Sequence, residues 1–190
     1  MSSKRGICCT PLDRSGPGPE PEGNIGGRTG LGMDWAGWAV FGVAATAALT
    51  ALLIVAQMAG LTRLDIPLLL GTFLTEDPDR ARVFGFFLHL GFGQMFALGY
   101  ALGFAVLGLA TWWLGAIFGL LHVGLALTAI IPLLPGVHPR MSSERAGLES
   151  RTVLEPPGLL VLNYGRETPL VATIAHVIYG VVLGLLINPS

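Results

Sequence analysis

Charge is the feature that this sequence has least of. Only 12% of its 190 residues are Asp, Glu, Lys or Arg, while 52% are hydrophobic. A soluble domain carries about twice that share of charge. The formal net charge of −1 also excludes the basic surface with which proteins bind nucleic acid. We therefore expect a lipid bilayer, rather than water or nucleic acid, to surround most of the chain.

Cysteine and the common catalytic motifs are scarce as well. Cys8 and Cys9 are the only two cysteines, and adjacent cysteines rarely bridge each other, so no disulfide framework is expected. The sequence contains no phosphate-binding loop, no HExxH and no GxSxG. We predict no catalytic residue and no metal site, which favours a protein that is not an enzyme.

Three stretches contain no charged residue at all: 35–62, 83–139 and 168–190. A helix needs about 20 apolar residues to cross a bilayer, so the first and third stretches fit one helix each and the second fits two. The sequence therefore predicts an all-α, polytopic membrane protein, a bundle of four transmembrane helices. The expected spans are about 35–59, 83–107, 111–134 and 168–187.

The chain divides into a tail and this helical domain. Residues 1–32 are rich in Gly and Pro without apolar periodicity, so we expect a disordered tail. We expect Met33 to be the initiator methionine, and we interpret the tail as an upstream extension outside the native protein. The four-helix domain is expected to occupy residues 33–187.

Two short apolar segments lie in the loops after the first and third spans. Both contain the pattern Leu-acid-x-Pro-x-Leu-Leu, at 64–70 and 154–160, and the first is predicted to be a short interfacial helix capped by Asp65. A further echo links 41–53 with 118–131, if one inserted residue is allowed. Together these echoes predict a tandem repeat of a two-helix unit.

Basic residues are concentrated on one side of the predicted bundle. Seven arginines fall in the loops between spans one and two and between spans three and four, and none lies in the turn between spans two and three. By the positive-inside rule, both long loops are predicted to be cytoplasmic. The high Arg, Ala and Gly content is typical of a GC-rich genome, so we expect a multi-pass protein of a bacterial inner (plasma) membrane.

Three histidines lie within the predicted spans, at His89, His122 and His176. At helical spacing each shares a face with glycine or alanine, which is the face that packs against other helices in membranes. We therefore expect all three rings to point into the bundle. Counting residues from the long-loop ends places His89 and His176 at one level and His122 one or two turns deeper. His138, by contrast, is expected to be solvated at the interface.

These residues leave three hypotheses open. In the first, the protein is a non-enzymatic accessory or scaffold subunit whose histidines hydrogen-bond between helices, and its partners are other membrane subunits or copies of itself. In the second, His89 and His176 are axial ligands of a b-type haem. In the third, the protein is a small oligomeric transporter or channel. The residues expected to line a pocket or make polar contacts between helices are His122, Gln94, Tyr100 and Tyr179.

Small residues also recur as Gly-x-x-x-Gly pairs, a spacing that lets helix backbones approach closely. We expect these pairs to pack helices within one chain. They are Gly99–Gly103, Gly115–Gly119 and Gly180–Gly184.

Three short motifs resemble a family of small four-span bacterial membrane proteins of unknown function. They are "LDIPLLLG" (64–71), "GLLH" (119–122) and "AHVIYGVVLGLL" (175–186). The resemblance covers about residues 33–187 and implies a four-span fold. It implies no activity, substrate or cofactor.

Overall fold

The structure is a computed structural model that describes residues 35–141 and 154–187. The predicted tail, with Cys8 and Cys9, lies outside the described residues. Within them all regular secondary structure is helical, apart from one isolated bridge between Met141 and Leu154. Four segments are long and apolar enough to cross a membrane, which confirms the predicted all-α class with four long apolar helices. They are Trp35–Met58, Pro78–Leu107, Trp112–Gly136 and Thr168–Leu186.

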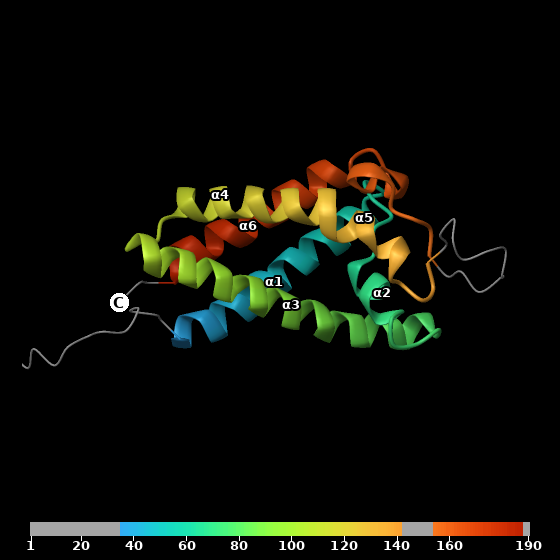
Figure 1. Cartoon of the computed structure of the whole chain (residues 1–190), viewed down its shortest axis with the longest axis horizontal. Helices are drawn as coiled ribbons and strands as arrows, with labels where there is room; N and C mark the ends of the chain where they lie inside the picture. The colour runs from blue at the N-terminus through green and yellow to red at the C-terminus, as the bar shows by residue number, and fades with distance from the viewer. Residues whose placement is uncertain (1–34, 142–153, 188–190) are drawn as a thin grey trace, which may run out of the picture.

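The four long segments run side by side (Figure 1). The first is α1 (Trp35–Met58) and the second is α3 (Pro78–Leu107). The third contains α4 (Trp112–Leu125), η1 (Ala126–Ile130), α5 (Ile131–Leu133) and η2 (Leu134–Gly136), and the fourth is α6 (Thr168–Leu186). Two short helices, α2 (Ile66–Gly71) and η3 (Leu159–Tyr164), lie in the long loops.

Local side chains fix where three of the helices begin. The Asp77 side chain accepts hydrogen bonds from the Asp79 and Arg80 N–H groups, and Pro78 occupies the first turn of α3. The Thr111 hydroxyl accepts from the Leu114 N–H at the start of α4. The Asp65 carboxylate accepts from the Leu68 N–H, 2.9 Å away, so the predicted short helix after the first span is confirmed.

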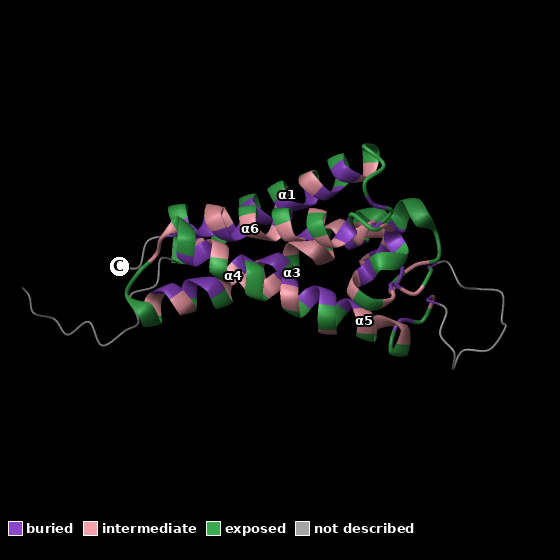
Figure 2. Ribbon diagram, turned by 90° about the horizontal axis from the view of Figure 1, so that it is seen from above, coloured by how far each residue is buried: buried purple, intermediate pink, exposed green. Residues whose placement is uncertain are grey.

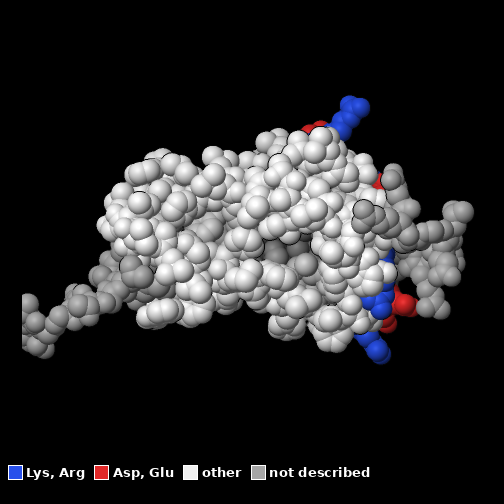
Figure 3. Space-filling view, in the orientation of Figure 1, with Lys and Arg blue, Asp and Glu red and all other residues white. Residues whose placement is uncertain are grey.

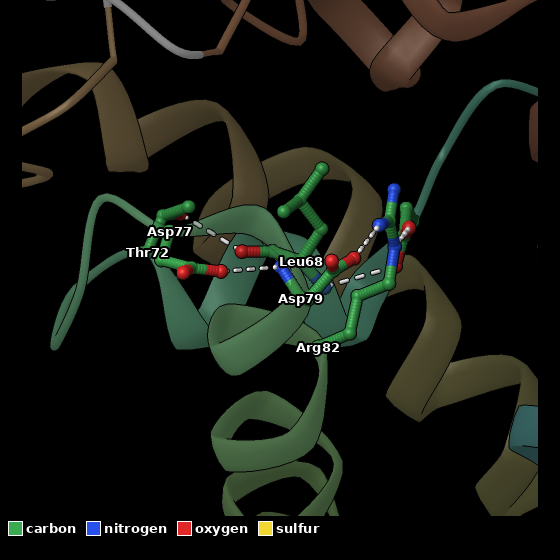
Figure 4. Close-up of polar contacts among 6 residues, drawn as sticks. Leu68, Thr72, Asp77, Asp79 and Arg82 are labelled. Atoms are coloured by element: carbon green, nitrogen blue, oxygen red, sulfur yellow. Dashed lines mark hydrogen bonds and ion pairs between the residues drawn. The ribbon is translucent and has the colours of Figure 1, made fainter.

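The Asp65 carboxylate also receives Arg82 from α3, with 3.0 Å between Oδ2 and Nε. This ion pair joins the start of α2 to the start of α3. Figure 4 shows the same corner, where Arg82 reaches toward Asp79 and the Thr72 hydroxyl bonds back to Leu68. The backbones of α2 and α3 are in direct contact here: Gly85 has no side chain, and a Cβ atom at this position would overlap the backbone of Pro67.

Glycine also allows the backbones of α4 and α6 to pack closely. A Cβ atom at any of four positions would overlap backbone atoms of the opposite helix, and these positions are Gly115, Gly119, Gly180 and Gly184. Two of the Gly-x-x-x-Gly pairs therefore pack against each other within the chain, as expected. The third pair does not pack backbones, since Gly99 faces open space and Gly103 lies beside the Phe118 ring.

The third long segment reaches Gly136, two residues past the expected end at 134, and it widens before Pro132. Proline cannot donate a backbone hydrogen bond, and its ring crowds the carbonyl four residues earlier. The turn Ala126–Ile130 is a π-helix, whose wider hydrogen-bonding ring accommodates this defect. The helical path therefore continues through α5 to Gly136.

Apolar side chains cover the outside of the bundle, and charges gather at one end. On the long helices, exposed residues lie on the outer faces and buried residues lie on the faces toward the other helices (Figure 2). The outward set includes large apolar side chains such as Val55, Phe87, Val106, Leu121 and Leu170. On the face shown in Figure 3, the Lys, Arg, Asp and Glu side chains lie at the end that carries α2 and η3.

Candidate functional site

A cavity of about 510 Å³ lies inside the bundle, in the half that is nearer to α2 and to the charged end. Its walls come from α1, α3, α6 and the stretch from α4 to α5, and α2 covers one end. The cavity opens on the face shown in Figure 3, which is hollowed between α3 and the α4–η1 stretch. The lining side chains are almost all aliphatic or aromatic, and none is charged. His89, His122 and His176 all contribute to the wall.

His89 is held by a hydrogen-bond chain from α1. Its Nδ1 lies 2.9 Å from the Thr50 hydroxyl oxygen, and the Thr50 hydroxyl lies 2.8 Å from the Thr46 carbonyl. A hydroxyl has one proton, and Thr50 donates it to that carbonyl. Both contacts of the Thr50 hydroxyl are satisfied together when His89 Nδ1 carries the proton and donates it to Thr50, which leaves Nε2 with a lone pair in the neutral ring.

His176 has the same tautomer for a simpler reason. Its Nδ1 lies 2.8 Å from the Ala172 carbonyl oxygen, one turn earlier in α6. A carbonyl oxygen only accepts, so Nδ1–H is the donor and Nε2 again has the lone pair. This hydrogen bond lies within one helix, whereas the bond of His89 joins α3 to α1.

His122 lies among aromatic rings. It stacks on Phe96 with 3.8 Å between ring centroids, and it meets the His176 ring edge-on at 4.6 Å. Its Nδ1 is 3.4 Å from the Tyr100 hydroxyl. The expected depth of His122, one or two turns below His176, is wrong. The four helices do not end at one level, so counting from their ends misplaces a ring.

The other predicted polar residues take different places. Tyr179 lines the cavity, and its hydroxyl donates to the Gly93 carbonyl at 2.6 Å, joining α6 to α3. Tyr100 is buried against His122, away from the cavity wall. Gln94 lies outside the cavity and pairs with the start of α1, where its side-chain amide donates to the Ala39 carbonyl and its backbone carbonyl accepts the Trp38 indole N–H.

His138 is not solvated, and the sequence interpretation of this residue is wrong. The side chain is buried against Phe73, with 4.1 Å between ring centroids. Its Nε2 donates to the Leu69 carbonyl at 3.1 Å, and its Nδ1 accepts the Arg140 backbone N–H at 3.1 Å. Burial lowers the pKa of the His138 imidazole below its ordinary value of 6.5, the Leu69 carbonyl opposes this shift, and the Arg140 charge adds to it.

Sequence analysis did not identify Arg140 as a site residue, but Arg140 contacts the end of α2 next to His138. Its guanidinium donates to the Thr72 and Phe73 carbonyls at the end of α2 and lies 3.6 Å from the Glu76 carboxylate. His138 and Arg140 together hold the segment that follows η2 against α2. In the sequence, the only indication of this contact is that the hydrophobic run ends in "GVHPR".

No group of three His, Cys, Asp or Glu side chains is placed to hold a metal ion within residues 35–141 and 154–187. The environment of the histidines that line the cavity is typical of small-molecule pockets, which are concave and mainly apolar with a few fixed polar groups.

No family model, curated protein or solved structure matches this chain. The resemblance to small four-span membrane proteins therefore rests on the three short motifs alone, and the function has to be argued from the cavity.

Proposed function

We propose that this chain is a multi-pass integral membrane protein that binds an apolar or amphipathic small molecule in its cavity. The binding role refines the non-enzymatic accessory subunit expected from the sequence. One observation carries it: an uncharged cavity of about 510 Å³ opens on the lateral face of the bundle and has three imidazoles in its wall. Small-molecule sites are concave, mainly apolar pockets of about this size with a few fixed polar groups, and the cavity has these properties.

Membrane insertion is supported by the outer surface. Large apolar side chains are exposed on all four long helices, a surface that water would penalise and acyl chains would not. Among the residues that the structure describes, the charged side chains visible in Figure 3 gather at one end of the bundle, as they do where helices leave a bilayer. We propose a bacterial inner membrane with the long loops on the cytoplasmic side, so that the cavity lies in the cytoplasmic half.

The structure also supports a tandem origin of the two halves. The sequence echo between 41–53 and 118–131 requires one extra residue in the second copy, just before the part that aligns Thr50 with Thr128. The π-helical turn Ala126–Ile130 lies at this place. A π-turn contains one residue more than an α-turn, so it is a natural way to absorb a one-residue insertion without rotating the rest of the helix.

Haem ligation by His89 and His176 is the second candidate. It is favoured because both rings fix Nδ1 on a protein oxygen and leave Nε2 for a metal, the usual arrangement of a ligating histidine. The cavity wall has no Arg or Lys to meet two haem propionates, which favours an uncharged ligand instead. A Soret band in the purified protein, lost in His89→Leu, would establish haem. The transporter or channel hypothesis stays a prediction.

Photolabelling tests the proposed binding. The full chain in lipid nanodiscs is labelled with an alkyl diazirine, with and without excess unlabelled alkane of the same length. We expect labelling near Leu49 and Leu127, which line the cavity and are otherwise buried, to be saturable and suppressed by competitor. Labelling of Leu121, on the outer face, should rise linearly and resist competition. Linear, competitor-resistant labelling at both places would overturn the proposal.

A further inference from the structure

The two anchored histidines determine which kind of polar group the cavity can accept. In both His89 and His176, the Nδ1–H group donates a hydrogen bond to an oxygen atom of the protein. Within the described residues, neither Nε2 makes a hydrogen bond, and neither is among the side-chain atoms fully buried without a partner. Each Nε2 lone pair therefore keeps accessible surface, and both rings line the cavity.

We infer that the ligand carries a hydroxyl on an aromatic ring, a phenol or quinol head with an apolar tail, and donates a hydrogen bond to His89 Nε2 or His176 Nε2. This inference rests on the proposed function and specifies its ligand. A neutral imidazole with Nδ1–H already committed can only accept at Nε2, so a ligand that offers only acceptors, such as an ether or a quinone, gains nothing there. A donor in a water-poor cavity gains the full hydrogen bond.

The shape of the cavity supports a ring at the histidine end and a tail beyond it. Around the histidines the wall contains Phe96, Phe92 and Tyr179, and aromatic walls favour stacked or edge-on rings. Toward α2 and α5 the wall is aliphatic, with Leu64, Ile66, Leu69, Leu127 and Ile131. The opening between α3 and η1 lets a tail leave sideways into the bilayer.

An uncharged donor also fits the electrostatics better than a cation. The described wall contains no carboxylate to compensate a positive head, and burying an uncompensated charge is costly. A hydroxyl supplies a proton for the lone pair without bringing a charge. Of the donors that cross lipid readily, alcohols and phenols remain, and the aromatic wall selects the ring.

Two probes of nearly equal shape test this inference. 4-Nonylphenol and 4-nonylanisole differ by one methyl group, and only the phenol donates. Binding of each to the full chain in nanodiscs is measured against empty nanodiscs. We expect the phenol to bind about tenfold more tightly, the usual effect of one buried hydrogen bond. In His89→Leu and His176→Leu the preference should decrease while anisole affinity is retained.

The outcomes separate the inference from the proposed function. Saturable binding of both probes with equal affinity would overturn the donor inference and leave the proposed function standing. No saturable binding of either probe would overturn the proposed function, and the inference with it. An unchanged phenol preference in both histidine variants would overturn the assignment of the acceptors. The wild-type ratio alone decides the donor question, even if a variant does not fold.

Discussion

The His122 ring meets the His176 ring edge-on, with 4.6 Å between the centroids and 86° between the planes. The contact depends on the glycine below it, because a Cβ atom on Gly119 would overlap the His176 carbonyl oxygen. α4 and α6 can therefore approach closely enough to present two imidazoles to one cavity. The close packing of the helices and the candidate site thus have one structural cause.

Gly119→Ala tests this dependence. The added methyl group has no room against the α6 backbone, so we expect the free energy of unfolding to fall by about 1–3 kcal/mol. Unfolding in mixed micelles, followed by circular dichroism, measures the change. Gly124→Ala is the matched control in the same helix, since no atom lies within 4 Å of a Cβ at that position. Equal destabilisation by the two substitutions would contradict the packing account.

Thr50→Val tests the anchor of His89. The variant keeps the shape of the side chain but removes the oxygen that accepts from Nδ1, so we expect a loss of about 1 kcal/mol in stability. Thr128→Val is the control, because Thr128 is exposed and bonds only to the Gly124 carbonyl of its own helix. If both variants have the same free energy of unfolding, the hydrogen bond between Thr50 and His89 contributes nothing to stability.

The buried His138 predicts loss of stability in acid. Its pKa is lowered in the folded protein by burial, so the unfolded chain takes up a proton more readily. The contribution is complete above the ordinary pKa of 6.5 and decreases as the pH falls below it. We therefore expect the temperature at the midpoint of thermal unfolding to decrease as the pH is lowered from about 7.5 to about 5.

His138→Gln provides the comparison for this pH dependence. Glutamine can still donate to the Leu69 carbonyl, but it does not titrate in this range. The variant should have a lower midpoint at pH 7.5 and a flatter pH dependence than the wild type. An equally steep dependence in the variant would contradict the role assigned to His138.

Sequence analysis predicted what depends on local chemistry and composition. The absence of charge predicted the long helices, and Asp65 was expected to cap the short helix, which its side-chain hydrogen bond does. The Thr168 hydroxyl, at the start of α6, bonds instead to the Thr62 hydroxyl at 2.7 Å. That partner lies 106 residues away, so no local pattern could reveal it.

The site was less accessible to prediction for the same reason. Small-residue spacing pointed to the inner face of each helix, and His89, His122 and His176 do line one cavity. The tautomers depend on Thr50 and Ala172, and the relative depth of the rings depends on how the helix ends are staggered. His138 lies next to proline and arginine in sequence, which suggests exposure, yet α2 folds over it.

The most direct test of the central claim is the stoichiometry of 4-nonylphenol binding in nanodiscs, compared between Leu88→Trp and Leu121→Trp. Leu88 lines the cavity, whereas Leu121 is exposed on the outer surface and away from it. If the cavity is the binding site, the wild type and Leu121→Trp each bind one saturable equivalent per chain, and Leu88→Trp binds none with its thermal unfolding midpoint preserved. Equal saturable binding by both variants, or none by the wild type, would contradict the account.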